Sequence, residues 1–258
     1  MAAAETERWV CPWRNNKMLP PKILSEIISE YVTLNLVEPN IYSVYSSGDM
    51  LGSYDKFGAA TIYDLIACNR FYNWLMWGYP IKDYATLCKE ALASSSGGWV
   101  LDLACGSLAF TAEVYANCSN RPLVFLDQSL KLLRKGKSRI EKLMGDIPEN
   151  LFFLHADALQ LPFKANVFHS IISLNLLHCL DDVKTVLREL KRVLKDGGNS
   201  AITTLVQSSR WSTRYLNMLA GSGALISRSA DELLSVFNEI EIQATHKIKG
   251  NLAFIKYG

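Results

Sequence analysis

The sequence lacks the closely spaced cysteines that a zinc module or a redox pair needs, because no two cysteines stand three positions apart. Zinc sites usually draw on cysteine or histidine pairs that are close in sequence. We therefore expect reduced thiols and no metal site. The six cysteines are Cys11, Cys68, Cys88, Cys105, Cys118 and Cys179.

Long apolar runs and a leader-like start are also missing. No stretch reaches the ~20 apolar residues that a membrane-spanning helix needs. The first residues, MAAAETER, lack a basic start followed by an apolar run. These absences predict a soluble, cytoplasmic protein without a membrane span.

Charge of one sign is not in excess, since 27 basic and 25 acidic residues leave a net charge of +2. This balance gives no electrostatic case for nucleic acid as a partner. Basic side chains do gather in a predicted helix over residues 130–143, where we interpret them as its solvated face. The 258 residues, 49% of them hydrophobic, suit one α/β domain with an extension or two small domains.

Three short apolar runs, each closed by an acid, are present in the middle of the chain. Residues 99–102 predict a buried strand that ends at Asp102, and an Ala-Cys-Gly-Ser turn and a helix follow. Residues 123–127 and 151–157 end at Asp127 and Asp157, which lie 25 and 30 residues further along. This spacing is typical of successive strand–helix–strand units. The carboxyl ends of parallel strands meet at one edge, so the three acids are expected to line one crevice.

The motifs VLDLACGSL, FLDQS, HADALQLPF and LKRVLKDGG, in this order, resemble those of class I S-adenosylmethionine-dependent methyltransferases. The similarity is greatest to the type 11 subgroup, which includes ubiquinone and menaquinone C-methyltransferases, and it runs from Tyr54 to the C-terminus. The resemblance implies an α/β, Rossmann-like seven-stranded sheet with an antiparallel last strand and an N-terminal helical lid. It also implies S-adenosyl-L-methionine as the cofactor and S-adenosyl-L-homocysteine as the product.

The resemblance implies one set of cofactor-binding residues. Asp127, about 20 residues after Gly106, is placed to accept from the ribose hydroxyls. Asp157 would accept from the adenine amino group, and the Ala158 amide would donate to the ring. The full set is Tyr63, Asp102, Ala104, Gly106, Asp127, Gln128, Asp157, Ala158 and Asn175.

The glycine loop departs from the family pattern, because Leu108 stands where a further glycine is usual. The incomplete G-x-G-x-x-G pattern argues against a dinucleotide. Purely structural interpretations stay open for the acids. Asp102 could cap a helix or close a turn, Asp127 could cap the helix that follows it, and Asp157 could be a turn acid.

Methylation of a hydroxyl or an acidic carbon needs a base. The candidates are His178, after the fourth predicted strand, and the lid tyrosines Tyr72 and Tyr63; His178 could instead cap or pack beneath the lid. Aromatic residues in the lid predict an apolar or aromatic small-molecule substrate or, alternatively, core packing. They are Phe71, Tyr72, Trp74, Trp77 and Tyr79.

Three segments are predicted along the chain. Residues 1–53 form an extension with a helix over 22–32 and a possible hairpin over 33–45, residues 54–94 a helical lid, and residues 95–258 the cofactor-binding core. Within the core we expect a strand over 167–174, a helix over 181–194, a turn over 195–198 and a strand over 200–206. A capping box at Ser229 and a hairpin over 239–257 complete the chain.

The most direct interpretation is a methyltransferase that acts on a carbon, nitrogen or oxygen of a small molecule. A nucleic-acid or protein methyltransferase, a thiol-using methyltransferase and a cofactor-binding protein without catalysis stay open. The acceptor and the oligomeric state are unknown from the sequence.

Overall fold

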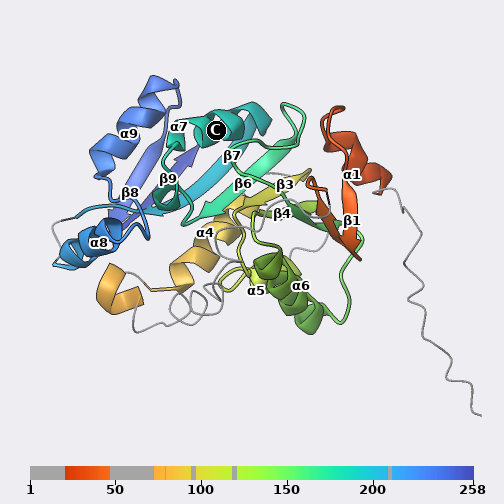
Figure 1. Cartoon of the computed structure of the whole chain (residues 1–258), viewed down its shortest axis with the longest axis horizontal. Helices are drawn as coiled ribbons and strands as arrows, with labels where there is room; N and C mark the ends of the chain where they lie inside the picture. Colours follow the sequence, from red (N-terminus) through yellow and green to blue (C-terminus); the bar gives the residue numbers. More distant parts are fainter. Residues whose placement is uncertain (1–20, 47–72, 79, 94–96, 118–120, 209–210) are drawn as a thin grey trace, which may run out of the picture.

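The computed structural model describes residues 21–46, 73–78, 80–93, 97–117, 121–208 and 211–258. Tyr63 and Tyr72, with about half of the predicted lid, lie outside these residues. The described part is an α/β fold built on one sheet, as the sequence predicts (Figure 1).

The sheet has nine strands among the described residues, in the order β1-β2-β5-β4-β3-β6-β7-β9-β8. The seven strands that the sequence predicts are β5-β4-β3-β6-β7-β9-β8 in this order, and β9 runs antiparallel to β7. The prediction of seven strands was therefore low by two, because the N-terminal hairpin extends the sheet. The strands are β1 (Asn35–Glu38), β2 (Ile41–Ser43), β3 (Val100–Leu103), β4 (Leu123–Asp127), β5 (Leu151–His155), β6 (Phe168–Leu174), β7 (Leu194–Leu205), β8 (Thr245–Lys249) and β9 (Leu252–Tyr257).

Helices cover both faces of the sheet (Figure 1). One face packs against α1 (Lys22–Ile27), α7 (Val183–Val193) and α9 (Ala230–Glu239). The other packs against α4 (Lys82–Ala93), α5 (Ala112–Ala116) and α6 (Leu130–Met144). Shorter elements are a π-helix η1 (Asn73–Trp77) and a 3-10 helix η2 (Leu177–Cys179), and α8 (Ser212–Gly221) precedes α9.

The apolar runs of the central strands serve both faces at once. Leu101 and Leu103 of β3 enter the core beneath α7, whereas Val100 enters the core beneath α4 to α6. Successive side chains of a strand point to opposite faces, so a strand covered on both sides is apolar throughout. The same alternation directs Asp102 toward α4 to α6, where its carboxylate needs a partner.

Three local predictions differ from the structure. The helix predicted over 22–32 ends at Ile27, because Ile28 is extended and forms an isolated bridge with Phe163. The expected turn over residues 195–198 belongs to β7, where the pairing shifts: Leu194 pairs with Phe168 but Asn199 pairs with Ser170. Gly197, at φ 70°, allows the backbone to loop out there without ending the strand. The first strand of the hairpin predicted over 239–257 starts later, at Thr245, because α9 continues to Glu239 from a capping box at Ser229.

Candidate functional site

Asp127 ends β4 at the carboxyl edge of the sheet, and its carboxylate joins two loops. Its Oδ2 accepts from the Gly106 amide at 2.8 Å, and its Oδ1 accepts from the Ser129 amide at 2.8 Å. Ser129, and not Asp127, caps α6 through its hydroxyl. A carboxylate has about four acceptor positions, so one such group can hold both loops and still take part in ligand binding.

The loop between β3 and α5 holds three residues in the left-handed region, namely Ala104 at φ 55°, Gly106 at 56° and Leu108 at 55°. A non-glycine residue with this backbone is strained, and such strain gathers at functional sites. A Cβ added to Gly106 would meet no atom of the described residues within 4 Å, so these residues leave the backbone open to a ligand there. The Arg139 guanidinium fastens the loop by donating to the carbonyl and the hydroxyl of Ser107.

Asp102 lies beneath this loop and lines the same small cavity as Gly106 and Asn175. Its side chain is buried and accepts from the Tyr115 hydroxyl at 2.7 Å. Burial raises the pKa of Asp102 to about 7, the Tyr115 hydrogen bond lowers it, and the Asp127 charge raises it. Asp102 pairs with Phe125 of β4, two residues before Asp127. The acids thus share one edge at different depths, and Asp102 supports the loop from below.

Asp157 and Ala158 follow the end of β5. The Asp157 carboxylate accepts from the Leu159 amide at 2.9 Å, as a turn acid does. Within the described part of the chain, no group accepts from the Ala158 amide. That amide stands three residues beyond His155, which pairs with Asp127. A donor for a ligand is therefore placed beside the Asp127 turn.

Asn175 follows β6 with a left-handed φ of 64°. Its amide nitrogen donates to the Tyr84 hydroxyl at 2.5 Å, and its Oδ1 accepts from the Thr203 hydroxyl at 3.3 Å. Tyr84, on α4, stacks on Phe110 with ring centroids 4.9 Å apart. Asn175 and Phe110 line a cavity of about 50 Å³ with the loop. Tyr84 was not predicted from the sequence as a site residue, because 91 residues separate it from Asn175.

His178 is buried in η2. Its Nδ1 accepts from the Leu205 amide at 3.2 Å, which places the proton of a neutral ring on Nε2. Burial, and next the Arg228 charge, lower the pKa of His178 to about 4. The base role stays a prediction, and this hydrogen bonding favours the alternative of a packed, neutral histidine.

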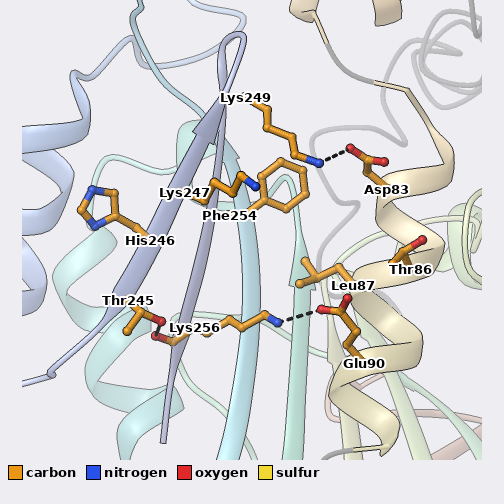
Figure 2. A pocket seen from close by; sticks show the side chains of 10 residues that line it. All are labelled: Asp83, Thr86, Leu87, Glu90, Thr245, His246, Lys247, Lys249, Phe254 and Lys256. Atoms are coloured by element: carbon orange, nitrogen blue, oxygen red, sulfur yellow. Dashed lines mark hydrogen bonds and ion pairs between the residues drawn. The ribbon is translucent and has the colours of Figure 1, made fainter.

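A second hollow, of about 320 Å³, lies between α4 and the β8–β9 hairpin (Figure 2). Lys249 pairs with Asp83 at 2.8 Å and Lys256 pairs with Glu90 at 2.8 Å, so both ion pairs join the hairpin to α4. Exposed pairs of this kind contribute little stability. They lie on the helix that carries Tyr84 and thereby help to fix its position.

The described residues hold no group of histidines, cysteines and acids that could bind a metal ion. Within the same residues, no helix is long and apolar enough to cross a membrane. Within the described residues, the features that remain are the open backbone of Gly106, the Asp127 carboxylate at the edge of the sheet and the Ala158 amide. They fit the adenosyl and amino-acid parts of S-adenosylmethionine.

Comparison with known proteins finds similarity to methyltransferases. Residues 100–198 match the family described as Methyltransferase domain. The chain is 37% identical over 114 residues to a demethylmenaquinone methyltransferase of Corynebacterium urealyticum, which covers 44% of each protein. It is 30% identical over 149 residues to a 2-phytyl-1,4-naphtoquinone methyltransferase of Nostoc punctiforme, which covers 57% of this chain and 63% of that protein.

Among solved structures, a SAM-dependent methyltransferase from Aquifex aeolicus superposes with a TM-score of 0.55 at 17% identity, over 72% of this chain and 92% of that one. At this identity the likeness shows the fold. The chain spans about half the length of the curated relatives it matches, with 44% and 63% for the two quoted.

Proposed function

Because this chain carries a class I S-adenosylmethionine-dependent methyltransferase domain of the menaquinone C-methyltransferase-like type, we propose that it methylates a small-molecule acceptor. S-adenosyl-L-methionine is the cofactor of such a domain. The observation that carries the proposal is Asp127, held by the amides of Gly106 and Ser129 at the carboxyl edge of the sheet.

Each site residue then has a stated task. Asp127 accepts from the ribose hydroxyls, and the Asp127–Gln128 turn supports it. The Gly106 backbone borders the amino-acid part, with Ala104 shaping the loop. Asp157 and the Ala158 amide take the adenine edge. Asp102 holds the loop from below, and Asn175, fixed by Tyr84, faces the end where the methyl group is transferred.

Bound S-adenosylmethionine supplies an electrophilic methyl group. The protein's part is to place a nucleophile in line with it, at roughly 3–3.5 Å. We propose that the acceptor is planar and apolar, because Phe110 and Leu174 line the cavity beside Asn175. The naphthoquinone methyltransferases among the relatives point to a reduced quinone as the first acceptor to test. Tyr63 stays a candidate for cofactor binding, and Tyr72 and His178 stay candidates for the base.

Calorimetry with S-adenosylmethionine and S-adenosylhomocysteine tests the cofactor, and release of S-adenosylhomocysteine on adding menadiol tests the reaction. We expect binding of both ligands and acceptor-dependent release. Binding without release for any small acceptor would favour a non-catalytic cofactor-binding protein. Salt-dependent RNA binding with RNA methylation would favour a nucleic-acid methyltransferase, and modification of a polypeptide would favour a protein methyltransferase. Imaging of the tagged full-length protein tests the predicted cytoplasmic location.

A further inference from the structure

The N-terminal hairpin reaches the same edge of the sheet as the proposed cofactor site. β2 pairs in parallel with β5, and Ser43 lies opposite His155. On the other side of β5, His155 lies opposite Asp127. Since carboxyl ends of parallel strands meet at one edge, the end of β2 joins the edge that carries Asp127.

A buried chain of hydrogen bonds links these strands. His155 Nδ1 lies 3.1 Å from the Ser43 hydroxyl, and His155 Nε2 lies 3.1 Å from the Gln128 carbonyl oxygen. A carbonyl oxygen only accepts, so Nε2 carries a proton. In the neutral ring Nδ1 then accepts from Ser43, whose oxygen accepts from the Tyr45 amide at 3.0 Å.

Packing fixes the ring as well. The Tyr45 ring meets the His155 ring edge-on, with centroids 4.8 Å apart. The side chains of Ser43 and His155 are almost fully buried. Hydrogen bonds at both nitrogens and the contact with the Tyr45 ring hold the His155 ring in one orientation. Its N–H donor, at Nε2, points at the carbonyl oxygen of Gln128, the residue after Asp127.

We propose that His155 is a positioning residue for the cofactor, and that Ser43 of the N-terminal extension fixes its tautomer. By holding the Gln128 carbonyl, His155 sets the turn that aims the Asp127 carboxylate at the ribose. The inference rests on the proposed function. It places part of the cofactor-binding machinery in Ser43, outside the segment 100–198 that matches the family.

The test compares affinity for S-adenosylhomocysteine with thermal stability in its absence. We expect His155→Leu to weaken binding about tenfold, because a hydrogen bond that orients the turn is lost. His155→Gln can still donate near the Nε2 position and should stay within about threefold of wild type. His155→Asn reaches only the Nδ1 position and should behave like His155→Leu. Ser43→Ala keeps the ring and should weaken binding a few-fold.

His169→Leu is the matched control. His169 stands at the start of β6, at the opposite edge of the sheet, with its Nδ1 also buried. We expect its substitution to leave the affinity unchanged, whatever it does to the melting temperature. The double variant Ser43→Ala/His155→Leu should bind no worse than His155→Leu, because one chain of contacts is broken twice.

The outcomes separate the two proposals. Wild-type affinity in His155→Leu, or equal losses in His155→Leu and His169→Leu, overturns the inference and leaves the proposed function standing. If His155→Leu does not fold, wild-type affinity in both His155→Asn and Ser43→Ala overturns it. A wild-type protein that binds no S-adenosylhomocysteine overturns both.

Discussion

The Leu108 side chain occupies the space that Gly136 leaves open on α6. A Cβ at Gly136 would lie 3.2 Å from Cγ of Leu108 and 3.5 Å from the Gly106 carbonyl oxygen. Leu108 stands where the family usually has a glycine, and it keeps the left-handed backbone, with φ 55°, that a glycine would favour. The bulk added in the loop is thus matched by a glycine inside a helix.

The contact between Leu108 and Gly136 predicts that the effect of Gly136→Ala on the free energy of unfolding changes sign when Leu108 is replaced by alanine. In the wild-type background we expect Gly136→Ala to lower the free energy of unfolding by about 1 kcal/mol, because overpacking, at ~1–3 kcal/mol, outweighs the helix propensity gained. In a Leu108→Ala background the same substitution should raise stability by about 1 kcal/mol, since only the propensity gain remains. Urea unfolding of the four proteins checks both values, and equal effects in the two backgrounds would contradict the pairing.

The raised pKa of Asp102 predicts how the free energy of unfolding depends on pH. Its pKa is raised to about 7 in the folded protein, so the folded state holds a proton that the unfolded chain releases near pH 4. The stability that Asp102 contributes is therefore present below pH 4 and is lost as the pH rises to about 7. The free energy of unfolding of Asp102→Asn should therefore rise relative to that of wild type across this window, as measured by urea midpoints at pH 5 and 8.

Two comparisons support the Asp102 assignment. Tyr115→Phe keeps the acid but removes its 2.7 Å hydrogen bond, so the pH dependence should remain and steepen. A constant difference between Asp102→Asn and wild type from pH 5 to 8 would mean that Asp102 does not titrate in this window.

The lowered pKa of His178 predicts the opposite dependence of stability on pH. Its pKa is lowered to about 4 in the folded protein, whereas the unfolded ring titrates near 6.5. The unfolded chain binds the extra proton first, so this contribution to stability is present above pH 6.5 and is lost as the pH falls to about 4. His178→Gln should therefore lose less stability than wild type between pH 7 and 4.5.

The same residue decides a point about catalysis. If His178 stays neutral, with its Nδ1 accepting from the Leu205 amide, it is not the base. The pH profile of kcat/KM of His178→Gln should then keep every inflection of the wild-type profile. Loss of an inflection near pH 6–7 in His178→Gln, at unchanged cofactor affinity, would instead support the base role.

The sequence predicted the parts of the fold that local pattern encodes. Each of β3, β4 and β5 is a short apolar run with an acid at or near its end, and the glycine turn marks where a loop meets the crevice. The pairing of β2 with β5 was not predictable, because nothing in a three-residue strand specifies its neighbour. The contact of Tyr84 with Asn175 and the fit of Leu108 to Gly136 are likewise long-range, and they arise only once the helices dock.

Asn175 tests whether backbone strain is present at the site. Both Asn175→Ala and Asn175→Gly remove the contact with Tyr84, but only alanine must adopt φ 64° with a Cβ. We expect the glycine variant to be more stable by about 1 kcal/mol, because the left-handed conformation costs L-residues that much. Thermal unfolding of both variants measures the difference. A more stable alanine variant would show that this backbone relaxes.

Asp127 carries the proposed site, and its substitution is the most direct test. Asp127→Ala removes the proposed acceptor for both ribose hydroxyls, and bonds to a charged group contribute ~1.5–3 kcal/mol. We expect affinity for S-adenosylhomocysteine to fall roughly 10- to 150-fold. Because Asp127 also holds the amides of Gly106 and Ser129, a general loosening of the loops must be separated from the lost contact. Wild type should prefer 5′-methylthioadenosine to its 2′-deoxy analogue, and Asp127→Ala should lose that preference. The exposed Asp146→Asn serves as the control with unchanged affinity, and a variant that still discriminates the 2′-hydroxyl would remove Asp127 from the ribose site.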